Sequence, residues 1–222
     1  RMDFVRFSGE TFIYLVLIAC GGAVLFAMAA LLFTAINIDI SEIIGQHLVL
    51  GGMCGASIVA VYLAGAKRNI IENMAPVLAR IFSPLFLLLM LAFIGVMTVS
   101  GNFVEVDREI LIGFDILLAV VLGILLYLIS ARDERRDPDF LDIINTALIF
   151  SALIVDAIAL TAIAMRIQSF GFTPNKTAAL GENIILLVNL AVSGILYLKF
   201  LIRKEGFRRL VVWQTAYLPF LA

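Results

Sequence analysis

The chain has 222 residues, of which 63% are hydrophobic and 15% charged, with a formal net charge of −1 and a mean hydropathy of +1.09. A soluble domain is about half apolar and about a quarter charged. This composition therefore excludes an ordinary water-soluble fold, and it offers no basic surface for nucleic acid. The sequence predicts an all-α, polytopic transmembrane helix bundle, organised as a single domain over residues 1–222.

Six apolar stretches are long enough to cross a bilayer, which takes roughly 20 mostly apolar residues. In chain order they are Phe12–Ile36, Leu48–Ala66, Phe82–Val99, Ile110–Ile129, Ile143–Met165 and Ile184–Ile202. The connections are too short for a soluble catalytic domain, so function must arise from the helices, the loops or a partner. The chain begins Arg1-Met2 and ends inside an apolar run, and we therefore expect a piece of a longer membrane protein.

Two further segments have alternative interpretations. Asn69–Ser83 carries apolar residues at helical spacing and is either an interfacial amphipathic helix or an extension of the third span. Pro76 and Pro84 favour a break over one straight helix. Leu210–Ala222 is either interfacial or the first part of a seventh span, and the abrupt end of the chain favours the span.

The distribution of basic residues predicts the orientation. Lys and Arg number thirteen in the two terminal segments and the even-numbered connections, and three in the odd-numbered connections. By the positive-inside rule, both termini are cytoplasmic and the first, third and fifth connections face outward.

Small residues predict where the first two spans approach each other. The second span contains Gly51-xxx-Gly55 followed by alanines at four-residue spacing, and the first contains Gly21 and Gly22. Such residues allow close contact between helix backbones. The alternative is a dimerisation seam between two chains.

Three polar residues inside the predicted spans are candidates for a site: Asp115, Asp156 and Asn189. A mid-bilayer aspartate costs roughly 2.5–3.5 kcal/mol on insertion scales, so it should face other helices or water. The predicted topology puts all three in the outer half of the last three spans. Glu182 shares a helical face with Asn189, and His47 is within reach. The alternative is that water or a neighbouring carbonyl satisfies each polar group locally.

The remaining motifs give little support for other chemistry. The two cysteines, Cys20 and Cys54, lie in apolar runs without metal-ligand spacing and are interpreted as packing residues, and we expect no metal or cofactor. No Walker loop, HExxH or GxSxG motif is present, which disfavours an enzyme. The charged fourth connection, Ser130–Asp139, is interpreted as a solvated cytoplasmic turn, with a docking site for a soluble partner as the alternative.

The segment Met165–Lys176 reads MRIQSFGFTPNK. It resembles the R-I-x-x-[YF]-G-[FL]-T-x-N-[RK] segment of the bacterial membrane family catalogued as domain of unknown function 4153, and residues 79–93 resemble that family's stretch leading into a helix. The resemblance covers about residues 70–222. It implies a multi-spanning, permease-like protein of the bacterial inner membrane with no established activity. The matching positions in the segment are Arg166, Ile167, Phe170, Gly171, Phe172, Thr173, Asn175 and Lys176.

The same segment has a physical interpretation of its own. Gly171 permits a positive φ, and Thr173-Pro174-Asn175 suits a turn and a helix start. Arg166 and Lys176 are expected at the outer mouth of the site, where they would clamp a lipid phosphate or a carboxylate such as that of Glu182. A lysine where arginine is commoner weakens bidentate binding of an anion. The alternative is an ordered turn tied down by a salt bridge.

These observations leave three classes of function. The first is a transporter-like or channel-like membrane protein with its site in the outer half of the last three spans. The second is a non-catalytic scaffold or sensor that binds protein or lipid partners. The third is a membrane-embedded enzyme acting on lipid-linked substrates. Expected partners are membrane lipids, and other membrane subunits or further copies of the chain.

Overall fold

A computed structural model of the chain describes residues 2–65, 74–100, 108–171 and 173–221. Six helical stretches are long and apolar enough to cross a membrane, and the described residues contain no β-strand. The prediction of an all-α polytopic bundle is therefore confirmed. In chain order the elements are α1 (Met2–Thr34), α2 (Ser41–Ile43), the π-helix η1 (Ile44–Leu48), α3 (Val49–Gly65), α4 (Met74–Ser100), α5 (Arg108–Ser130), α6 (Phe140–Phe170), α7 (Pro174–Leu201) and α8 (Arg208–Leu221).

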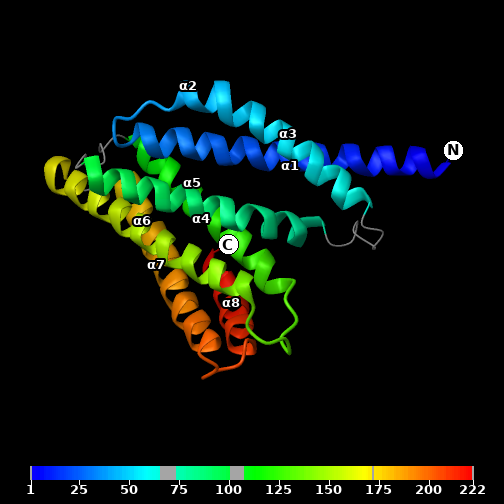
Figure 1. The fold of residues 1–222 in the computed structure, drawn as a ribbon. Coiled ribbons are helices and arrows are strands. Elements are labelled where there is room, and N and C mark those ends of the chain that lie inside the picture. The colour runs from blue at the N-terminus through cyan, green and yellow to red at the C-terminus, as the bar shows by residue number, and fades with distance from the viewer. Residues whose placement is uncertain (1, 66–73, 101–107, 172, 222) are drawn as a thin grey trace.

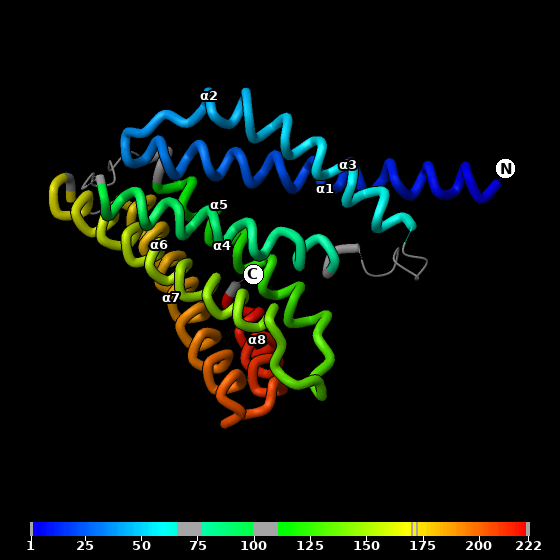
Figure 2. Tube along the Cα trace, in the orientation of Figure 1, coloured from blue at the N-terminus to red at the C-terminus, as the bar shows by residue number. Residues whose placement is uncertain are grey.

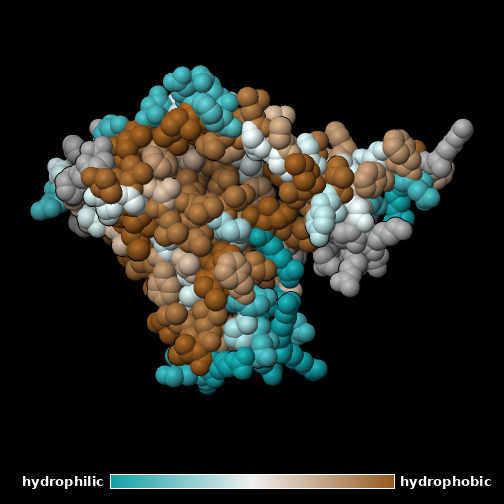
Figure 3. All heavy atoms as spheres, in the orientation of Figure 1, coloured by the Kyte–Doolittle hydropathy of each residue, from teal (hydrophilic) through white to brown (hydrophobic). Residues whose placement is uncertain are grey.

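The helices form two groups (Figures 1 and 2). The pair α1 and α3 lies along one side of the molecule, and α1 packs against α4 and α5, which in turn contact α6. Helices α7 and α8 run together away from that side, with the turn between them at the far end. Hydrophilic residues gather at this turn and over α2, and hydrophobic residues cover most of the surface between them (Figure 3). Lipid is the solvent that such a surface requires.

The two ends of the bundle differ in the segments that meet there. We call the end where α5 and α7 begin and α6 ends the pocket end. We call the opposite end the Arg132 end; it holds the loop between α5 and α6 and the turn between α7 and α8.

The helices are longer than the predicted spans because polar residues continue a helix beyond its apolar part. Helix α1 begins at Met2, ten residues before its predicted span, and α7 begins at Pro174, ten residues before Ile184. Helix α4 runs unbroken through Pro84, so the predicted break there is wrong. Packed transmembrane helices tolerate proline because neighbouring groups satisfy the backbone that it disturbs. Residues 69–73 lie outside the described residues, and 74–83 belong to α4.

Helix α8 lies antiparallel to α7. Phe207 contacts Phe200 with ring centroids 5.3 Å apart, Gln214 bonds to Ser193, and the Tyr217 hydroxyl donates to the carbonyl of Ile185. Residue numbers thus rise along α8 as they fall along α7. Helix α8 therefore runs back along α7 from the Arg132 end into the bundle.

Close helix contacts depend on particular small residues. A Cβ on Gly113 of α5 would overlap the Leu31 side chain of α1, and a Cβ on Gly21 of α1 would overlap the Phe82 ring of α4. The first two spans do pack together, as predicted. A Cβ at Gly51 or Gly55 would meet nothing within 4 Å, however, and the buried residues of α3 are the alanines Ala56, Ala60 and Ala64.

A candidate polar site between α5, α6 and α7

A pocket of about 360 Å³ opens at the pocket end of the bundle. Its floor and walls combine apolar residues, such as Leu111 and Ile163, with charged and polar side chains from α5, α6 and α7. We call it the polar pocket. The predicted site residues that line it are Asp115, Arg166, Thr173, Asn175, Lys176 and Glu182.

A hydrogen bond between α7 and α5 fixes the inner wall of the polar pocket. The side-chain Nδ2 of Asn183 donates to Asp115 Oδ1 at 2.6 Å and to the carbonyl of Ala179 at 3.0 Å. Asn183 is fully buried, whereas Asp115 is half-buried. Sequence reasoning missed Asn183 because it started the last span at Ile184. Pro174 after Thr173 is a typical helix start and was the available signal.

Asp156 lies behind Asp115 in the middle of α6. Leu111 of α5 packs with Ile163 of α6, so these two residues mark one level of the bundle. Asp115 is four residues inward from that level, about 6 Å, and Asp156 is seven residues inward, about 10 Å, at 1.5 Å per residue. Asp156 is therefore about one helical turn deeper in the bundle than Asp115.

The environment of Asp156 is unusual for an acid. The residue has no exposed surface, and neither carboxyl oxygen has a hydrogen-bond partner among the residues that the structure describes. Burying a carboxylate without a partner costs several kcal/mol or more. A carboxyl group in this position needs a proton or a cation as its companion.

The mouth of the polar pocket is formed by the turn between α6 and α7. Gly171 has φ +74°, the positive value that the sequence predicted. The Lys176 Nζ donates to the carbonyl of Gly171 at 3.0 Å and, at 3.5 Å, to that of Arg166, so its charge lies at the carboxyl end of α6. A cation is favourable there because the last helix carbonyls carry partial negative charge. Lys176 thus ties down the turn through two carbonyls, and the half-buried Arg166 lines the pocket.

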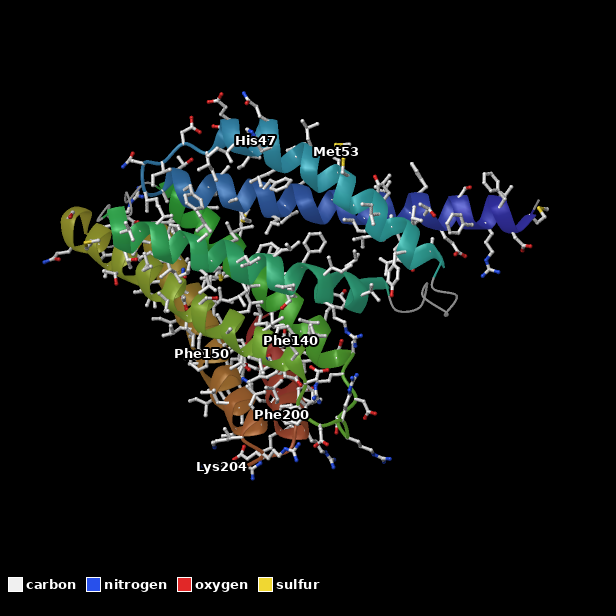
Figure 4. The ribbon with its side chains drawn as sticks, viewed as in Figure 1. His47, Met53, Phe140, Phe150, Phe200 and Lys204 are labelled. Carbon is white, nitrogen blue, oxygen red and sulfur yellow. The ribbon has the colours of Figure 1, made fainter. Side chains whose placement is uncertain are left out.

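Asn189 does not line the polar pocket. Because α7 begins at Pro174, Asn189 lies about 22 Å along the helix at 1.5 Å per residue. Its amide exchanges two hydrogen bonds with Gln214 of α8, at 3.0 and 3.2 Å. The structure thus assigns Asn189 to the contact between α7 and α8. His47 is exposed on η1, on the side of α1 and α3 (Figure 4), and it does not line the pocket either.

Comparisons with protein-family models, curated proteins and solved structures found no match. The chemistry of the site must therefore be inferred from its own residues. In the described part of the chain, no group of three or more His, Cys, Asp or Glu side chains is arranged to hold a metal ion. The polar pocket offers the carboxyl groups of Asp115 and Glu182, with the cationic side chains of Arg166 and Lys176. Asn183 and Asp156 are buried behind this lining.

A second polar network lies at the Arg132 end, in the connection whose sequence predicted a solvated turn, with a docking site as the alternative. The Arg132 guanidinium binds both carboxylate oxygens of Asp142, with N–O distances of 2.9 and 2.7 Å, and donates to three loop carbonyls. It also lies 4.5 Å from the ring centroids of Phe200 and Phe207. Its side chain is 10% exposed and that of Asp142 is 2% exposed, so the network is buried. Arg132 thereby joins the loop to α6, α7 and the turn before α8.

Proposed function

We propose that the chain is a transporter-like or permease-like membrane protein in which the polar pocket admits a solute and Asp156 is the ionisable coupling group. The observation that carries the proposal is the burial of Asp156, without a partner among the described residues, one turn behind a pocket that contains Asp115. Ionisable residues inside membrane bundles generally mark ion or substrate pathways, because each has an insertion cost that folding alone does not recover.

The geometry suggests how the two acids act together. Asp115 is held by Asn183 at the pocket wall, where an ion or proton arrives first. Asp156 lies a turn further in, among apolar residues of α6. A proton or small cation that moves from the first carboxyl to the second would give the buried site the companion that it lacks. The negative charge of Asp115 opposes a second negative charge at Asp156, so occupancy of the two carboxyls is coupled.

We further propose that the polar pocket faces outward in a bacterial inner membrane, with both termini in the cytoplasm. The support is the distribution of Lys and Arg, which are concentrated in the terminal segments and at the Arg132 end. The family resemblance at residues 165–176 supports the same architecture. The positive φ of Gly171 fits the glycine of that motif.

The test is chemical modification of Asp156 with dicyclohexylcarbodiimide, which partitions into membranes and reacts with protonated carboxyl groups. We expect one principal adduct by mass spectrometry, on Asp156, with a yield that falls as pH rises. Asp156→Asn should lose it, and Asp137→Asn, a change in the exposed loop, should keep it. Cations or solutes that enter the polar pocket should slow the labelling, which makes the reaction a screen for the transported species.

The second measurement is proton movement in proteoliposomes that contain a pH-sensitive dye. Solutes that protect Asp156 should drive a dye response in wild type, and Asp156→Asn should abolish that response while the protein stays folded. If Asp156 resists modification at every pH, or if the Asn variant moves protons as wild type does, the coupling role is wrong.

A membrane scaffold or sensor is the alternative that a specific observation favours. Helices α1 and α3 contribute the least buried of the six spans, which leaves long apolar faces for lipid or partner helices. A scaffold would tolerate Asp156→Asn without any change in ion or solute movement. The same proteoliposome assay therefore separates the two functions.

A further inference from the structure

A second cavity lies between α7 and α8 at the Arg132 end, on a different part of the molecule from the polar pocket. Its volume is about 620 Å³, within the range of small-molecule sites. We call it the α7–α8 groove. The residues that line it are Val192, Leu196, Gly206, Arg208, Arg209, Val212, Trp213 and Ala216.

The chemistry of the groove changes along its length. Arg208 and Arg209 stand in the first turn of α8, next to the hydrophilic turn at the end of the bundle (Figure 3), where Lys204 is labelled in Figure 4. Val212 and Ala216 follow about 6 and 12 Å further along α8 at 1.5 Å per residue. Val192 and Leu196 of α7 form the facing wall. The groove is therefore cationic at its mouth and apolar along its length.

The two arginines differ in whether an acid of the protein already pairs with them. Arg209 Nη1 lies 2.6 Å from Glu205 Oε1, and Lys199 shares the same carboxylate oxygen at 3.1 Å. Arg208 is exposed, and it makes no ion pair within the described residues. The amino-terminal end of α8 adds partial positive charge at the same place. The mouth thus has net positive charge that the fold itself does not neutralise.

Trp213 forms part of the wall of the groove. Its ring borders the groove, and its Nε1 is buried without a hydrogen-bond partner among the described residues. Tryptophan at a membrane surface normally places its N–H on a polar group while its ring remains in the apolar region. The buried Nε1 is not open to the groove, so a lipid chain in the groove would meet the indole ring.

We propose that the α7–α8 groove binds one anionic phospholipid, with its phosphate at Arg208 and Arg209 and an acyl chain along Val192, Leu196 and Val212. A basic pocket between helices at the cytoplasmic surface is the chemistry that recognises such headgroups. A second apolar helix in the groove would cover its apolar walls and leave the charge of Arg208 without a counter-charge. A zwitterionic lipid would fill the groove and bring its own cation toward the arginines.

The protein contains a single tryptophan, Trp213, so its fluorescence reports on this groove alone. The experiment uses the purified chain in phosphatidylcholine vesicles that contain either brominated phosphatidylglycerol or brominated phosphatidylcholine, since bromine quenches an adjacent indole. We expect the anionic lipid to compete for the quenching position roughly fivefold better than the zwitterionic lipid, the preference that about one effective basic charge provides. The preference should fall in high salt.

Matched variants test which residues cause the preference for the anionic lipid. Arg208→Gln should remove most of it, whereas Arg203→Gln should retain it, because Arg203 is equally basic but pairs with Asp137 and does not line the groove. Ala216→Phe, which leaves both arginines in place, should reduce quenching by either lipid because the ring fills the groove.

Any of three results would overturn the proposal. One is equal quenching by the two brominated lipids in wild type, which would mean that the lipid in contact with Trp213 is not selected by charge. Another is an equal loss of preference in the Arg203 and Arg208 variants, which would mean that general surface charge is responsible. Quenching absent from wild type with both lipids would indicate a second chain in the groove and would equally refute it. Each readout is independent of solute movement through the polar pocket.

Discussion

Replacing Arg132 with methionine should destabilise the protein more than any other single change in the loop between α5 and α6. Methionine keeps much of the side-chain volume and removes the charge. The change leaves the carboxylate of Asp142 buried at 2% exposure with its bidentate partner gone. It also removes the donor for three loop carbonyls and the cation between the rings of Phe200 and Phe207.

The magnitude follows from the loss of one partner of a buried pair, which costs about 3–5 kcal/mol. Each cation–aromatic contact adds about 0.5–1 kcal/mol. Asp142 still accepts a hydrogen bond from the backbone N–H of Asp139, at 2.9 Å, which offsets part of the loss. We therefore expect a decrease of about 3 kcal/mol in the free energy of unfolding. The stability of Arg132→Lys should lie between those of this variant and wild type, because lysine keeps the charge and loses the planar guanidinium fork.

The assay is equilibrium unfolding in mixed micelles by titration with sodium dodecyl sulfate, followed by helical circular dichroism and Trp213 fluorescence. The control is Arg136→Met, which removes an exposed pair with Asp139 at 3.8 Å and should change stability by less than about 1 kcal/mol. Similar losses for the Arg132 and Arg136 variants would refute the argument that burial determines the cost. In a double-mutant cycle, Arg132→Met and Asp142→Leu together should cost less than the sum of the two.

Two further predictions concern packing and orientation. Gly113→Ala should destabilise the bundle by about 1–3 kcal/mol because its methyl group would overlap Leu31. Gly123→Ala, with open space around it, should be neutral or slightly stabilising. The same unfolding titration measures both variants, and equal effects would contradict the packing argument. In a chain whose native cysteines are replaced by serine, a membrane-impermeant maleimide added to intact cells should label Glu42→Cys and leave Arg135→Cys unlabelled until the cells are opened. The opposite pattern would invert the proposed orientation.

The spans could be predicted from the sequence because hydrophobic length is a local property that the bilayer selects directly. The ends of the helices could not be predicted in this way, because a helix continues beyond the hydrocarbon core of the bilayer for as long as its backbone hydrogen bonds continue. That error had a consequence at α7. Starting the last span at Ile184 moved Asn189 toward the outer surface and left Asn183 out. Helix α7 begins at Pro174, where the sequence also suited a helix start, and Asn183 lies beside Asp115.

The gathering of Asp115, Arg166, Lys176 and Glu182 around one pocket was accessible from sequence, because these residues lie near the same ends of three consecutive antiparallel spans. The role of Arg132 was not. Among the basic residues of its loop, it differs only in what surrounds it, namely an acid on α6 and two aromatic rings from α7 and the following turn. Contacts between residues that are distant in the chain decide which charge is buried, and the pattern of the loop itself does not contain them.

The two buried aspartates of α6 show what the fold does with an acid when stability is the requirement. Asp142 has two bonds from one guanidinium, a third from the backbone of Asp139, and a place in the first turn of its helix, where negative charge is favourable. Asp156, on the same helix and equally buried, has none of these among the described residues. Asparagine or leucine there would avoid the cost of the acid with almost no change in shape. The coupling role that we propose for Asp156 accounts for this difference, because it gives the buried carboxyl group a proton or cation that comes and goes.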